Sequence, residues 1–157
     1  MFSLSRYEGR IVVNEATFER REKFIDVITD IEKILVIEDN RDSRDILSKL
    51  LRMSGYDVVS AGDGETGYTA ATDHLPDLII TDIHMPRLDG IEFVKKVREN
   101  GTLARIPILV VTAFGGNMAR EAVMAGADAS VEKPFDFDKF LSTVVELISQ
   151  NRKVAQS

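Results

Sequence analysis

The chain has 157 residues, a formal net charge of −6 and a hydrophobic fraction of 44%, which fits one globular domain with a short extension. This acidic balance argues against a direct nucleic-acid surface, and the lack of cysteine excludes disulfides, zinc–thiolate sites and thiol nucleophiles. The longest apolar run near the N-terminus, Ile11-Val12-Val13, is too short for a signal peptide or a membrane span, so we expect a cytoplasmic protein without a membrane partner.

Residues 1–32 are predicted to be an extension, because they precede the regular pattern of the chain. Apolar residues in it recur at helical spacing: Phe18, Phe24, Ile25, Val27, Ile28 and Ile31. Two interpretations stay open. One is a surface helix at a frayed terminus. The other is an amphipathic helix that buries this stripe against a partner or a second copy of the chain.

From residue 33 to residue 150 five strand-like runs alternate with five helix-like segments, and residues 151–157 are predicted to be a tail. The strands are expected at 33–38, 57–61, 78–81, 106–111 and 129–131, and the helices at 42–54, 65–74, 90–99, 117–125 and 138–150. The strands are continuous apolar runs, as burial on both faces requires. The alternation predicts an α/β fold with a doubly wound, five-stranded parallel sheet and helices on both faces.

Polar side chains stand where these predicted strands end: Glu38 and Asp39, Asp82, Thr112 and Lys133. Parallel strands end at one edge of the sheet, so we expect these residues to converge there. Two carboxylates about 4 Å apart repel by roughly 4 kcal/mol at an effective dielectric of 20, a large share of a domain's stability. A divalent cation would offset this repulsion, and a site with few carboxylates suits Mg²⁺.

Lys133 and Thr112 add hydrogen-bond donors to this edge. The lysine ammonium is a point charge that can hold a phosphoryl group and keep Asp82 ionised. The threonine hydroxyl can donate to an oxyanion, and a purely structural threonine is the alternative.

Four segments carry a resemblance to a known family: Ile34 to Asn40, Leu78 to Gly90, Ile108 to Ala113 and Val131 to Phe135. In this order and at this spacing they resemble the receiver domain of two-component response regulators, over about residues 33–150. The resemblance implies a flavodoxin-like sheet with strand order 2-1-3-4-5.

The resemblance also implies roles for the residues at the sheet edge. Asp82 would be the phosphoacceptor, taking a phosphoryl group from a phosphohistidine on a histidine kinase or histidine phosphotransfer protein. Mg²⁺ would be held by Asp39 and Asp82, by Glu38 through water and by the backbone carbonyl of His84. Lys133 would contact the phosphoryl group and be followed by a cis peptide bond.

A switch region of Ala113, Phe114 and Ser130 is implied in the same way, with Thr112 among the catalytic residues beside it. Thr112 would move toward the phosphate and carry the following residues with it. Receivers usually have an aromatic residue three positions before the lysine, where this chain has Ser130, so a swinging ring does not follow. Phe114 is a candidate substitute and would slow phosphate loss. His84 would tune the same lifetime, or be a solvent-facing loop residue.

The predicted function is a phosphorylation-dependent signalling switch that catalyses only its own phosphorylation and dephosphorylation. We expect no attached output domain, so the chain would bind a downstream protein or relay the phosphate. The expected contact surface is formed by the fourth helix, fifth strand and fifth helix, and a homodimer could use this face or the extension.

Two alternatives stay open. One is a receiver-like module that binds partners without phosphorylation. Ser130 keeps this alternative open, but the full set of Asp39, Asp82, Thr112 and Lys133 argues against it. A phosphatase of the haloacid-dehalogenase type with Asp82 as nucleophile is disfavoured, since such enzymes need an aspartate where His84 stands.

Overall fold

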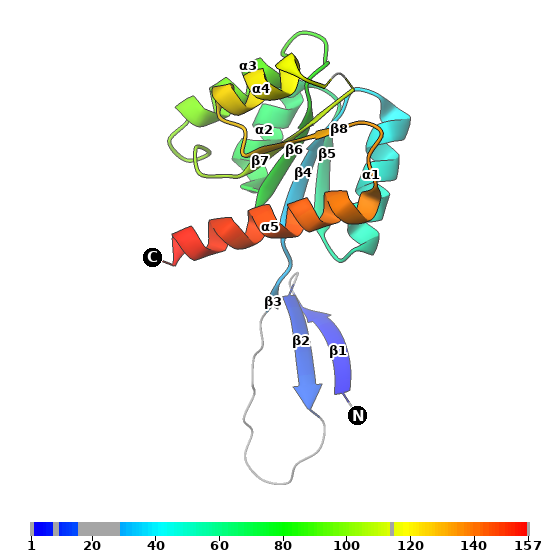
Figure 1. Cartoon of the computed structure of the whole chain (residues 1–157). Coiled ribbons are helices and arrows are strands. Elements are labelled where there is room, and N and C mark those ends of the chain that lie inside the picture. Colours follow the sequence, from blue (N-terminus) through cyan, green and yellow to red (C-terminus); the bar gives the residue numbers. More distant parts are fainter. Residues whose placement is uncertain (1, 8–9, 16–28, 114, 157) are drawn as a thin grey trace. The chain divides into compact units, whose positions relative to one another are not determined.

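The computed structural model describes residues 2–7, 10–15, 29–113 and 115–156. The chain divides into two compact units, Met1–Glu32 and Lys33–Ser157 (Figure 1). The predicted boundary between extension and domain falls at the same place.

The described part of the first unit is a small antiparallel sheet in the order β1-β2-β3. β1 (Phe2–Tyr7) pairs with β2 (Arg10–Glu15), and β2 pairs with β3 (Thr29–Asp30). The β-branched run Ile-Val-Val in β2 favours a strand, which the sequence analysis did not predict. Most of the predicted helical stripe (Phe18, Phe24, Ile25, Val27 and Ile28) lies outside the described residues, so the amphipathic helix stays a prediction.

The second unit is built on a parallel sheet in the order β5-β4-β6-β7-β8. Its strands are β4 (Lys33–Ile37), β5 (Asp57–Ala61), β6 (Leu78–Asp82), β7 (Ile108–Thr112) and β8 (Ala129–Glu132). Numbered along this unit, the order is 2-1-3-4-5, and the predicted topology is confirmed. β6 and β7 are buried throughout, because helices cover both faces of the sheet.

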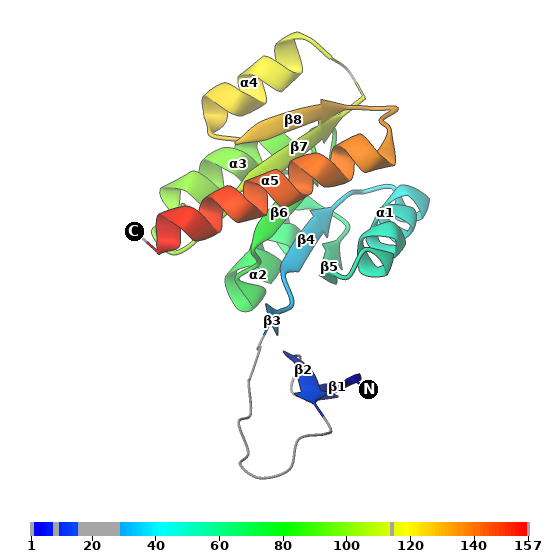
Figure 2. The same cartoon turned by 60° about the horizontal axis from the view of Figure 1, so that its bottom comes forward.

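Five helices cover the sheet: α1 (Arg41–Met53), α2 (Gly64–His74), α3 (Gly90–Glu99), α4 (Asn117–Ala125) and α5 (Phe137–Ala155). Leu51 of α1 and Phe140 of α5 pack on one face, while Phe93 of α3 and Ala122 of α4 pack on the other. Figure 2 shows α5 crossing the strands on its own face. Within the described residues no helix has the length and apolar character needed to cross a bilayer.

Four of the helices begin at a side-chain cap. Asn40, Asp63, Asp89 and Asp136 each accept a hydrogen bond from the backbone N–H three residues later. Such a cap stabilises a helix by about 1 kcal/mol. α4 has no side-chain cap and begins after Gly116, whose φ is 79°. The caps place the starts of α1, α2 and α5 one residue before the predicted ones.

We predicted a C-terminal tail from residue 151. This prediction is wrong for residues 151–155, because they belong to α5, which ends at Ala155. The added residues contain no Gly or Pro. Arg152 and Lys153 lie in the last turn of α5, where positive charge interacts favourably with the helix dipole.

Candidate functional site

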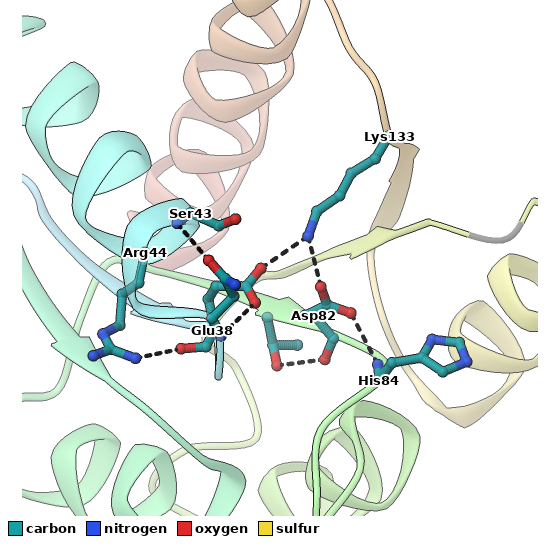
Figure 3. Close-up of polar contacts among 8 residues, drawn as sticks. Glu38, Ser43, Arg44, Asp82, His84 and Lys133 are labelled. Carbon is teal, nitrogen blue, oxygen red and sulfur yellow. Dashed lines mark hydrogen bonds and ion pairs between the residues drawn. The ribbon is translucent and has the colours of Figure 1, made fainter.

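The candidate site is centred on Asp82, the last residue of β6. Its side chain is buried, with the residue 8% exposed. Oδ1 accepts a hydrogen bond from the backbone N–H of His84 at 2.9 Å, and Oδ2 accepts one from Lys133 Nζ at 2.7 Å (Figure 3). The His84 ring points away from Lys133 and is exposed, so the protein contacts Asp82 through the backbone of His84.

Glu38 is the second buried carboxylate of the site and follows the last residue of β4. Its Oε2 accepts a hydrogen bond from Lys133 Nζ at 2.8 Å, and its Oε1 accepts one from the N–H of Asn40 at 3.0 Å. Its backbone carbonyl accepts a hydrogen bond from Arg44 Nη1 at 2.7 Å. Arg44 was not predicted, because its place on an ordinary helical turn gives no signal of a contact with β4.

Lys133 connects the two carboxylates and anchors the end of β7. Its N–H donates to the carbonyl of Thr112 at 2.8 Å, and its bond to Pro134 is cis, as expected. Burial lowers the pKa of Lys133, but the hydrogen bonds and charges of Asp82 and Glu38 outweigh it, so the pKa lies above its usual value. Desolvation raises the pKa of Glu38, Lys133 opposes this shift, and the charge of Asp82 adds to it.

The remaining predicted residues lie around this cluster. Thr112 is fully buried at the end of β7, the strand next to Asp82. Asp39 and Ala113 are exposed, and Ser130 is half-buried in β8. Phe114 lies outside the described residues. Convergence of the strand ends is therefore observed, with Glu38, rather than Asp39, in direct contact with Lys133.

The donor chemistry of the site fits a hard divalent cation. Glu38, Asp39 and Asp82 offer only oxygen atoms, and the ammonium group of Lys133 balances one of the two buried carboxylates. Among the described residues, no three acidic or histidine side chains are already gathered as metal ligands. Here Lys133 Nζ lies between Glu38 and Asp82 (Figure 3), so a cation would compete with the ammonium group for the same carboxylates.

A pocket of about 580 Å³ opens beside the charged cluster, which forms part of its lining. Its walls are mostly apolar and include residues of α1, of the connection between β8 and α5, and of the start of α5: Ile46, Leu47, Leu50, Pro134, Phe135 and Phe137. Ile46 is 61% exposed. Asp82 can therefore be approached along an apolar wall, a feature typical of binding sites.

Gly90, the first residue of α3, lies against the backbone of Asp82 and Ile83. Its N–H donates to the carbonyl of Ile83 at 2.9 Å. A Cβ at this position would overlap the carbonyl oxygen of Asp82 and lie 2.7 Å from the Cα of Ile83. The absence of a side chain at Gly90 thus lets α3 begin directly behind Asp82.

We expect Gly90→Ala to lower the free energy of unfolding by about 2–3 kcal/mol, because backbone atoms of β6 must move to admit the methyl group. Urea unfolding measures this change. Gly101→Ala is the control, since nothing lies within 4 Å of its added Cβ, and we expect a change within about 0.5 kcal/mol. Equal stability of the two variants would contradict the close approach at Gly90.

The chain is similar to known response regulators. Residues 34–145 match the family model of the response regulator receiver domain. Over 126 residues the chain is 35% identical to the DNA-binding dual master transcriptional regulator RpaA of Synechocystis sp.; the match covers 80% of this chain and 52% of that relative, so the chain spans about half its length. It is 30% identical to the polar-differentiation response regulator DivK of Brucella anthropi, over 72% of this chain and 93% of DivK.

Solved structures show the same similarity. A putative response regulator from Chloroflexus aurantiacus has a TM-score of 0.73 at 29% identity, covering 76% of this chain and 98% of that one. The chemotaxis protein CheY4 of Vibrio cholerae has a TM-score of 0.71 at 32% identity, covering 74% and 98%.

Proposed function

The chain belongs to the family of response regulator receiver domains, and from this we propose that it is a phosphorylation-dependent signalling switch with Asp82 as phosphoacceptor. The observation that carries the proposal is the contact of Lys133 Nζ with Asp82 Oδ2 at 2.7 Å and with Glu38 Oε2 at 2.8 Å. These residues are far apart in the sequence, and a half-buried ammonium between two buried carboxylates is an arrangement that stability alone does not favour.

In the proposed reaction a carboxylate oxygen of Asp82 attacks the phosphorus of a phosphohistidine. The new O–P bond forms as the N–P bond breaks, and the imidazole leaves with the electron pair and takes a proton from solvent. The backbone N–H of His84 orients the carboxylate. Lys133 moves its hydrogen bonds to the phosphoryl oxygens, and Thr112 donates to them. The chain catalyses only this transfer and the later hydrolysis of its own phosphate.

Asp39, Asp82 and the backbone carbonyl of His84 would hold Mg²⁺, with Glu38 acting through water. The cation would neutralise charge on the phosphoryl oxygens. Burial raises the pKa of Glu38 more than Lys133 lowers it, so a further positive charge nearby would stabilise the ionised carboxylate.

We propose that the phosphodonor is a histidine kinase or a histidine phosphotransfer protein, which reaches Asp82 along the apolar wall that includes Ile46 and Phe135. A downstream protein would bind the face formed by α4, β8 and α5. Val123, Met124 and Val145 are exposed apolar residues on these helices, at 47%, 81% and 49%, and such residues support protein–protein contact there.

Incubation with acetyl phosphate and Mg²⁺, followed by intact-mass measurement, tests the proposal. We expect one hydroxylamine-labile phosphoryl group per chain, lost when a chelator is added, and borohydride reduction before peptide mapping should locate it at Asp82. Steady phosphate release without an adduct would favour the phosphatase instead. No adduct under any condition would favour a module that binds partners without phosphorylation.

A further inference from the structure

The connection from β7 to α4 contacts the side chain of Glu132 at Gly115. A Cβ built on Gly115 would lie 2.5 Å from Oε1 and 2.6 Å from Cδ of Glu132. The φ angle of Gly115 is not left-handed, unlike the φ of 79° at Gly116. The missing side chain at Gly115 therefore makes room for a carboxylate and does not serve an unusual backbone conformation.

The register of the sheet explains why Glu132 reaches this point. Glu132 is the last residue of β8 and pairs with Thr112. Ala129 and Val131 pack on the face covered by α1 and α5. Side chains alternate along a strand, so Ser130 and Glu132 belong to the other face, which α4 covers.

The start of α4 suits a nearby carboxylate. This helix has no side-chain cap and no acidic residue in its first turn. A negative charge near a helix N-terminus is favourable, and the Glu132 carboxylate lies against Gly115, two residues before α4 begins. Glu132 takes part in none of the ion pairs found among the described residues, so its position is not explained by a basic partner there.

We propose that Glu132 is a positioning residue of the phosphorylation site, which holds Gly115, and with it the start of α4, in the arrangement of the unphosphorylated protein. The proposal rests on the proposed function of Asp82. Lys133 binds Asp82 through its side chain and Thr112 through its N–H. Glu132, the residue before Lys133, contacts Gly115. Two consecutive residues thus connect the phosphoacceptor to α4.

Phosphorylation of Asp82 is expected to break the contact between Glu132 and Gly115. A phosphoryl group on Asp82 would draw Lys133 and Thr112 to new oxygen atoms and displace the adjoining Glu132 from Gly115. The Glu132–Gly115 contact belongs to the unphosphorylated arrangement, so its loss shifts the population toward the arrangement that accepts phosphate. We expect phosphorylation by acetyl phosphate to become roughly 5-fold faster when the contact is removed.

Three variants test the contact: Glu132→Ala, Gly115→Ala and the two combined. In Gly115→Ala the new methyl group displaces only the end of a flexible side chain, so the variant should fold. The Arg120 N–H donates to the carbonyl of Gly116 at 3.3 Å, so NMR amide hydrogen exchange of Arg120, measured without phosphate, should be faster in all three variants by a similar factor. Because both single changes remove the same contact, the double variant should add nothing further.

Two controls separate positioning from charge and from general stability. Glu121→Ala removes an exposed glutamate of α4 and should leave both exchange and phosphorylation rate unchanged. Glu132→Gln keeps the shape and an acceptor oxygen but removes the charge near the start of α4, so its exchange rate should lie between those of the unmodified protein and Glu132→Ala. Unchanged exchange in Glu132→Ala, or additive effects in the double variant, would overturn the proposal. Faster exchange in a protein that never accepts phosphate would leave the role of Glu132 standing and refute the proposed function.

Discussion

Asp82→Asn is expected to abolish phosphorylation, with a rate at least about a thousandfold lower, because an amide oxygen cannot serve as the nucleophile. The fold should be kept and be at least as stable. Asparagine can still accept the 2.9 Å hydrogen bond from the His84 N–H. It also removes one of the two buried carboxylates that share Lys133, so less like-charge repulsion remains.

Glu38→Gln is the matched control, because it removes the other carboxylate that contacts Lys133 and leaves the nucleophile in place. We expect slower phosphorylation, by about tenfold, with the adduct still formed at Asp82. Intact mass after acetyl phosphate treatment and urea unfolding measure the two effects. Uptake of phosphate by Asp82→Asn would place the acceptor elsewhere, with the neighbouring Asp39 the first position to map.

Arg98→Met is expected to cause the largest loss of stability, about 3–4 kcal/mol. The guanidinium donates hydrogen bonds of 2.8–3.0 Å to one carboxylate and three backbone carbonyls: Asp128 Oδ2, Gly126, Ala104 and Ile106. Asp128 Oδ2 also accepts the N–H of Ile108 at 2.8 Å. Burial lowers the pKa of Arg98 and Asp128 opposes the shift, and a guanidinium stays charged at neutral pH.

The network ties the end of α3 to the start of β7 and to the turn before β8, so its loss leaves several acceptors without their donor. Arg98→Lys should recover only part of the stability, since an ammonium group lacks the planar fork. Arg105→Met, at an exposed position, is the control and should change stability by less than about 0.5 kcal/mol. Urea unfolding measures the free energy of unfolding of each variant. A loss below about 1 kcal/mol for Arg98→Met would show that water replaces these contacts.

Most of the fold followed from local pattern. Continuous apolar runs mark strands buried on both faces, and helical periodicity marks where the helices lie. Their exact starts were set by caps such as Asn40, which the periodicity did not show. The strands of the extension and the end of α5 were not predicted. A strand pair depends on which segments meet, and a helix end without Gly or Pro carries no local stop signal.

The sequence by itself determined the alternation of elements, the polar residues at the strand ends and, through its resemblance to receivers, the order of the sheet and the choice of Asp82. Only the tertiary structure decided that Lys133 contacts Glu38 rather than Asp39, that Arg44 and Arg98 bind backbone carbonyls, and that Glu132 lies against Gly115. The reason is physical: periodicity and capping act between near neighbours in the chain. These contacts join residues on different elements, whose distances depend on strand register and on how the helices pack.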